Sequence, residues 1–131
     1  MLFRSAIDSS VNNLITETRI KGNYGGGIFI YKNCSEHLAE DPKQVIRWQS
    51  ADHNTISNNE ITGGKTGVWV ASRQSMNLQS MQCGNGYYAE DKYTLDSAKF
   101  NSILKNNISD VQYGVIVEDD NNLVEIGREH V

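Results

Sequence analysis

The chain has 131 residues, the length of one domain, and its hydrophobic share of 38% allows a narrow core rather than a wide one. Its net charge is −4 and its 12 basic residues are scattered, so it lacks the basic patch of a nucleic-acid-binding protein. No apolar stretch approaches the roughly 20 residues that span a bilayer, and residues 1–4 are too short for a signal peptide. We therefore expect a single domain over residues 1–131 that binds no nucleic acid and does not insert into a membrane.

Three segments of the chain share one order of residues. Each begins with an Asn and continues with aliphatic residues two and seven positions later, and a Gly followed by three apolar residues comes 13 or 14 positions after the Asn. The copies are Asn13, Ile15, Ile20 and Gly27–Ile30; Asn54, Ile56, Ile61 and Gly67–Val70; and Asn101, Ile103, Ile108 and Gly114–Val117. A fourth copy begins with Asn122 and Val124, so the 21 residues from Asn101 to Asn122 define the basic unit.

The repeat predicts stacked short strands. Aliphatic residues two positions apart lie on one face of a strand. Asn suits the corners between strands, because its short amide bonds its own backbone and tolerates left-handed conformations. One copy cannot bury its apolar face alone, whereas stacked copies form a continuous narrow core, and their Asn side chains pass hydrogen bonds from coil to coil. We therefore predict an all-β parallel β-helix, a short solenoid of about four to five coils.

Other interpretations of the pattern compete with this one. A helical fold is excluded because no segment keeps a 3.6-residue period over about 12 residues. Asn-rich disorder is disfavoured because each Asn cluster alternates with aliphatic residues. A β-sandwich also has short strands and turns, but it does not predict the same order of residues three times. The repeat resembles the right-handed parallel β-helix superfamily, which includes pectate lyases and carbohydrate-binding and sugar-hydrolysis proteins with parallel β-helix repeats. This resemblance covers nearly the whole chain outside two insertions and implies the fold, which hosts many functions.

The two insertions lie at about residues 31–44 and 71–95. Both follow the same strand of their copies, and the acidic residues Glu118, Asp119 and Asp120 follow that strand in the third copy. We expect all three segments on one face, because repeat proteins collect their binding loops there. Each insertion carries one cysteine, Cys34 and Cys83. These form either a disulfide, as in a secreted or periplasmic protein, or two reduced thiols, as in a cytoplasmic one.

The insertions and the acidic corner hold the candidate chemistry. A polysaccharide lyase needs a base that removes a proton beside a uronate carboxylate and a cation that stabilises the resulting charge. Residues of these types are the catalytic candidates: Arg73, Lys92, Asp119, Asp120 and His37. Glu118, Asp119 and Asp120 offer oxygens to calcium, although a solvated acidic turn is the alternative. No complete catalytic constellation is visible, so whether the chain is an enzyme stays open.

Aromatic residues indicate where a sugar would bind. Phe29 and Trp69 hold the middle position of their Gly triplets, so they face outward if the outer members fill the core. With Tyr87, Tyr88 and Arg73 they predict a substrate-binding surface, unless the insertions simply cover the stripe. The coil ends have no covering helix, so we expect self-association through these ends or the loop face, most simply a two-fold dimer. Two functions follow: a polysaccharide-binding module with lyase or hydrolase ancestry, or a non-catalytic structural module or truncated β-helix fragment.

Overall fold

A computed structural model describes residues 3–33, 49–73 and 97–129. These residues contain ten strands and no helix, and every strand pair among them is parallel. Sheet A consists, in spatial order, of β1 (Phe3–Asp8), β4 (Gly26–Tyr31), β7 (Thr66–Val70) and β9 (Tyr113–Val117). Sheet B consists of β2 (Leu14–Thr16), β3 (Arg19–Lys21), β5 (Thr55–Ser57), β6 (Glu60–Thr62), β8 (Ser102–Ser109) and β10 (Leu123–Glu129). The expected all-β fold with parallel sheets is confirmed.

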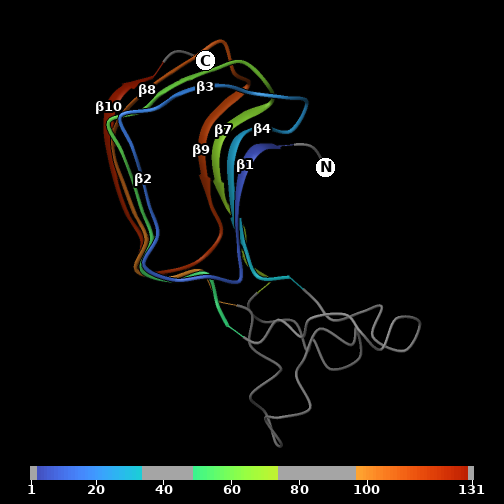
Figure 1. Cartoon of the computed structure of the whole chain (residues 1–131), viewed down its shortest axis with the longest axis vertical. Coiled ribbons are helices and arrows are strands. Elements are labelled where there is room, and N and C mark those ends of the chain that lie inside the picture. Colours follow the sequence, from blue (N-terminus) through green and yellow to red (C-terminus); the bar gives the residue numbers. More distant parts are fainter. Residues whose placement is uncertain (1–2, 34–48, 74–96, 130–131) are drawn as a thin grey trace, which may run out of the picture.

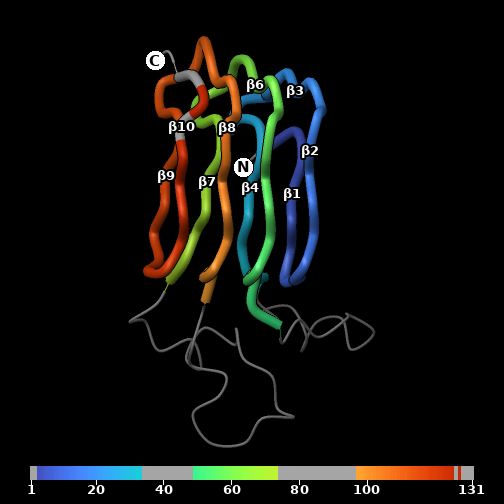
Figure 2. Tube along the Cα trace, turned by 90° about the vertical axis from the view of Figure 1, so that its left-hand side faces the viewer, coloured from blue at the N-terminus to red at the C-terminus, as the bar shows by residue number. Residues whose placement is uncertain are grey.

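The strand register reproduces the alignment of the repeat. Ile15, Ile56 and Ile103 are paired neighbours across β2, β5 and β8. In the same way, Phe29 pairs with Trp69 across β4 and β7. Equivalent strands of successive copies therefore lie side by side, from β1 at one end of sheet A to β9 at the other (Figures 1 and 2).

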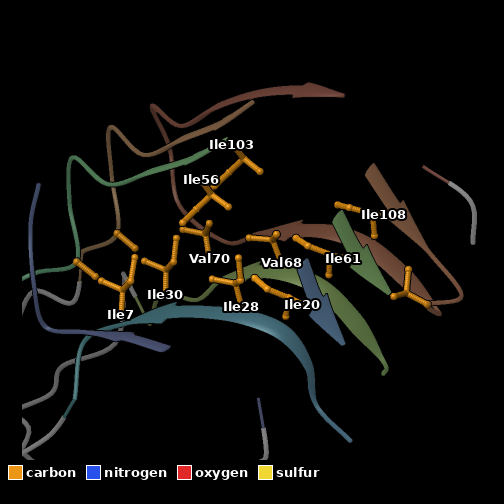
Figure 3. Close-up of a cluster of buried hydrophobic side chains, with 13 residues drawn as sticks. Ile7, Ile20, Ile28, Ile30, Ile56, Ile61, Val68, Val70, Ile103 and Ile108 are labelled. Atoms are coloured by element: carbon orange, nitrogen blue, oxygen red, sulfur yellow. The ribbon is translucent and has the colours of Figure 1, made fainter. Parts of the chain in front are cut away.

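Aliphatic side chains from both sheets fill the space between them (Figure 3). Ile28, Ile61 and Val68 have no exposed surface. The repeated glycines leave no room for a side chain: a Cβ added to Gly27 would lie 2.6 Å from Ile61 Cγ2 and 2.7 Å from the carbonyl oxygen of Gly67. Packing thus requires the Gly before the first two apolar triplets, because Ile61 and Ile108 of sheet B occupy the space of the missing side chains of Gly27 and Gly67.

A ladder of Asn side chains, buried at Asn54 and Asn101, runs along the stack. The Oδ1 atom of Asn54 accepts hydrogen bonds from the backbone N–H and the side-chain Nδ2 of Asn13, at 3.0 and 2.9 Å. The backbone N–H of Asn54 in turn donates to Oδ1 of Asn101 at 2.9 Å, and that of Asn101 donates to Oδ1 of Asn122 at 2.9 Å. The expected Asn ladder between successive copies is therefore confirmed, and the amide oxygens of Asn54, Asn101 and Asn122 all point toward the preceding copy.

A second ladder lies five residues further along each copy. The backbone N–H of Thr18 donates to Oδ1 of Asn59, and both the backbone N–H and Nδ2 of Asn59 donate to Oδ1 of Asn106, each at 3.0 Å. The repeat did not predict this ladder. Its Asn side chains also donate to backbone carbonyls of the neighbouring copy, as Asn106 does to Ile56 at 3.0 Å. Polar groups that the tight corners remove from water are satisfied in this way.

The left-handed corner residues directly precede the ladder residues, and Asn, the residue type expected at the corners, fills three of the seven positions: Asn12, Asn58 and Asn121. Left-handed residues with φ between 51° and 60° stand immediately before both ladders in successive copies: Asn12, His53, Phe100 and Asn121 before the first, and Glu17, Asn58 and Lys105 before the second. Asn fills only some of these positions, although it tolerates them best. The ladder hydrogen bonds offset the strain at the others.

Both insertions begin at the same end of the strands of sheet A, as the register predicted. The N–H of Ala71 donates to the carbonyl of Ile30, and the N–H of Glu118 donates to the carbonyl of Val70, so the three copies still run in parallel beyond their strands. Tyr31 pairs with Asp8 and belongs to β4, so the first insertion begins later than the expected residue 31. β7 ends at Val70, directly before the expected start of the second insertion at residue 71, whereas the expected ends at 44 and 95 lie outside the described residues.

Candidate functional site

Four aromatic side chains gather on sheet A, and we call them the aromatic cluster. The ring of Phe29 stacks on those of Phe3 and Tyr31, with centroid distances of 4.8 and 4.4 Å. The indole of Trp69 lies 5.3 Å from the Phe29 ring and 6.2 Å from the Phe3 ring, tilted to both. These are favourable separations for aromatic pairs. The cluster therefore forms one continuous apolar surface across β1, β4 and β7.

Strand alternation places Phe29, Tyr31 and Trp69 on the outer face of sheet A, and the Phe3 ring joins them by stacking on Phe29. Ile28 and Ile30, on either side of Phe29, have no exposed surface, whereas Phe29 and Trp69 are half-buried. Successive side chains of a strand point to opposite faces, so Phe29 and Trp69 point away from the core, as expected. The described residues form only sheets A and B, and no third layer among them covers this face. The role of Phe29 and Trp69 in binding a substrate stays a prediction.

Charged and polar groups line the edge of the cluster from which the insertions leave. The indole Nε1–H of Trp69 donates to Oε1 of Glu118 at 2.5 Å, which fixes the orientation of the indole and holds a carboxylate beside it. Nη2 of Arg73 donates to the backbone carbonyl of Lys32 at 2.9 Å. Arg73 and Lys32 belong to the first residues after β7 and β4, so this bond joins the stems of the two insertions. An anion and a cation thus stand at one end of an aromatic surface.

Asp119 is buried and bonds to residues on both sides of the second insertion. Its Oδ2 accepts hydrogen bonds from the backbone N–H of Ala98 at 2.9 Å and from Oγ of Ser72 at 3.0 Å. Its Oδ1 accepts the N–H of Asp120 at 2.7 Å and lies 3.8 Å from Nζ of Lys99. Ser72 and Ala98 flank the segment 74–96, so one carboxylate ties both of its stems to the third copy of the repeat.

The expectation of a solvated acidic turn is therefore wrong for Asp119, although Glu118 and Asp120 are exposed. A run of three acidic residues suggests solvation, but the strand register turns the middle one inward, where protein donors satisfy it. Among the described residues, no group of three or more His, Cys, Asp or Glu side chains is placed to hold a metal ion. Calcium binding by Glu118, Asp119 and Asp120 stays a prediction.

Other predicted site residues lie outside the described ranges, and so do both cysteines. They are His37, Lys92, Tyr87, Tyr88, Cys34 and Cys83. Their catalytic and binding roles and the disulfide stay predictions, as do the catalytic roles of Arg73, Asp119 and Asp120. The structure does bring Arg73 and Asp119 to adjacent stems, because Ser72 beside Arg73 bonds to Asp119. No helix in the described part of the chain has the length and hydropathy needed to cross a membrane.

Sequence reasoning missed two members of the aromatic cluster. Tyr31 lies two residues after Phe29 in the same strand, so strand alternation alone would have placed it on the same face. Phe3 lies in β1, which has no Gly triplet to reveal it as a strand of the repeat. The register of β1 against β4 aligns Ala6 with Phe29, yet the Phe3 ring still reaches the cluster.

Comparison of the chain with family models, curated proteins and solved structures finds no match. The resemblance to the right-handed parallel β-helix superfamily therefore stays a hypothesis that the repeat alone carries. The structure itself supplies the all-β architecture, the parallel sheets and the register of the repeat. Among the described residues, the aromatic cluster and the groups at its edge are the features that bear on function.

Proposed function

We propose that the chain is a right-handed parallel β-helix whose outer sheet A face binds a polysaccharide. The aromatic cluster is the observation that carries this proposal. Its rings follow one another across β1, β4 and β7, so the apolar surface extends along the direction in which the strands stack. That elongated shape suits a linear polymer, and large aromatic side chains offer apolar contact area with little conformational entropy to lose.

The edge of the cluster supplies the polar part of the proposed contact. Glu118 is exposed and holds its carboxylate beside the Trp69 indole, where it accepts hydrogen bonds from sugar hydroxyls. Arg73, on the neighbouring stem, offers guanidinium N–H groups to hydroxyls or to the carboxylate of a uronate. A mostly apolar surface with a few directed polar groups is the usual composition of a binding site for a small molecule or sugar unit.

We propose binding and assign no bond cleavage to the described residues. Asp119, the most buried of the candidate acids, receives hydrogen bonds from Ala98, Ser72 and Asp120 and is neighboured by Lys99. A carboxylate held this way stabilises the fold around it, because protein donors occupy most of its hydrogen-bonding capacity.

Affinity electrophoresis in gels that contain single polysaccharides tests the proposal. The panel holds neutral glucans and uronate polymers, each with and without calcium. We expect at least one polymer to retard the protein, and the Trp69→Ala variant to bind it about tenfold more weakly, a change of roughly 1.4 kcal/mol. Tyr24→Ala is the matched control, because Tyr24 is 89% exposed and lies outside the cluster. Retardation by no polymer, or equal loss in both variants, would contradict glycan binding by this face.

Absorbance of unsaturated products in the same uronate incubations separates binding from lysis. A signal that needs calcium would show that the protein cleaves the polymer, and would contradict binding without cleavage. Retardation without products is the expected result.

A further inference from the structure

The two outermost copies of the repeat carry complementary groups. The first Asn ladder is directional, since each backbone N–H donates to Oδ1 of the Asn in the following copy. At one end, Oδ1 of Asn13 accepts no hydrogen bond from the described residues, and at the other the backbone N–H of Asn122 donates to none of them. One end therefore offers the acceptor and the other the donor of the same ladder bond.

Exposed apolar side chains occur at both ends in the same rows. Leu14 on β2 is 65% exposed and Leu123 on β10 is 57% exposed, and both belong to the row that also contains Thr55 and Ser102. The inner members of this row, Thr55 and Ser102, are polar, so apolar residues occupy the row only on the two outer strands. Exposed apolar side chains at strand edges commonly mark a contact surface.

The remaining rows match in the same way. On sheet A, the row of Ile7 ends in the exposed Val117, and the row of Phe3 ends in the exposed Tyr113. On sheet B, the row of the partly buried Ile15 ends in the exposed Val124. If β9 and β10 of one molecule met β1 and β2 of a second molecule, apolar residues would meet apolar residues in each of these rows.

We propose that copies of this chain associate head to tail, with β9 and β10 of one copy pairing in parallel with β1 and β2 of the next. The junction continues both sheets and adds one more bond of the Asn ladder, from the Asn122 N–H to Oδ1 of the partner copy's Asn13. This arrangement differs from the expected two-fold dimer. A two-fold axis brings identical ends together, so ladder donors would face donors and the strands would meet antiparallel.

Head-to-tail contacts of this kind do not close, so the product is a linear row of copies whose length grows with concentration. The sheet A faces of successive copies lie on one side of that row, which would multiply the contacts to a long polymer. Self-association itself does not depend on glycan binding. In the same register Asp8 and Glu118 follow Ile7 and Val117, so carboxylates approach one another at the junction and added salt strengthens association by screening them.

Sedimentation velocity of the full chain over a range of concentrations tests the inference. We expect concentration-dependent species larger than a dimer for the wild type, in larger amount at higher salt. Leu123→Glu and Leu14→Lys each weaken association about tenfold or more, because a charge replaces an apolar contact at one end. Thr55→Lys places the same charge in the same row on an inner strand and leaves association unchanged. Circular dichroism spectra and melting curves establish that each variant is folded.

The variant that combines Leu14→Lys with Leu123→Glu distinguishes the two geometries. Head-to-tail contact brings the introduced lysine to the introduced glutamate, so association returns and now weakens with salt. A two-fold contact brings like charges together, so the combined variant associates no better than either single variant. That second result, or a monomer at every concentration of the wild type, would overturn the inference.

Discussion

Replacement of Asn106 by Ala probes the ladders that hold the copies in register. The Asn106 side chain is buried and makes three hydrogen bonds: its Oδ1 accepts from the N–H and Nδ2 of Asn59, and its Nδ2 donates to the carbonyl of Ile56, each at 3.0 Å. At about 1 kcal/mol for each bond, and somewhat more for the donors left without water, the loss is about 3–4 kcal/mol. That is a large part of the 5–15 kcal/mol that stabilises a typical domain.

Urea unfolding followed by far-ultraviolet circular dichroism measures this loss. With a slope of about 2 kcal/mol per molar, the midpoint of Asn106→Ala falls by about 1.5–2 M. Asn107→Ala is the matched control, because Asn107 is the next residue of the same strand and its side chain is exposed. We expect that variant to stay within about 0.5 kcal/mol of the wild type. Equal midpoints for the two variants would refute the view that the ladder stabilises the stack.

Three further substitutions test separate features, each by thermal and urea unfolding. Lys105→Asn should stabilise by about 0.5–1 kcal/mol, because Lys105 has φ of 53° and Asn tolerates that conformation better, and a lower melting temperature would disprove the strain. Gly67→Ala should cost about 1–3 kcal/mol, since its Cβ would lie 2.6 Å from Ile108 Cγ2, and an unchanged midpoint would show that the sheets have room to separate. Asp119→Asn should cost about 1–3 kcal/mol, because an amide NH₂ would face the N–H of Ala98 or Asp120, and wild-type stability would mean that Asp119 does not hold the stems.

The register of the fold was predictable because the repeat carries it in residues that the core requires. Ile56 and Ile103 must point inward, and Gly67 must lack a side chain where Ile108 packs against it. These demands recur in each copy, so aligning the copies aligned the strands. The second ladder escaped notice because Thr18 stands where later copies have Asn, and Thr contributes its backbone N–H without a side-chain amide.

The candidate site was predictable only in part, for physical reasons that differ from residue to residue. Phe29 and Trp69 followed from strand alternation, whereas Phe3 lies in a strand that lacks the Gly triplet. Asp119 looked solvated because two acidic neighbours flank it. The register could have corrected that, since Asp119 stands three residues before Asn122, just as the buried Ala98 stands three residues before Asn101. Composition alone does not show which residue of an acidic run turns inward.

The central claim is that the aromatic cluster binds the polysaccharide, and a nuclear magnetic resonance titration tests it most directly. The indole N–H signal of Trp69, assigned with the Trp69→Phe variant, is followed while a polymer that retards the protein is added as short oligosaccharides. We expect this signal to shift and to saturate with the binding curve, because the indole lies in the cluster and its N–H bonds to Glu118. An unchanged Trp69 indole, with shifts confined to the outer strands β2 and β10, would contradict the account.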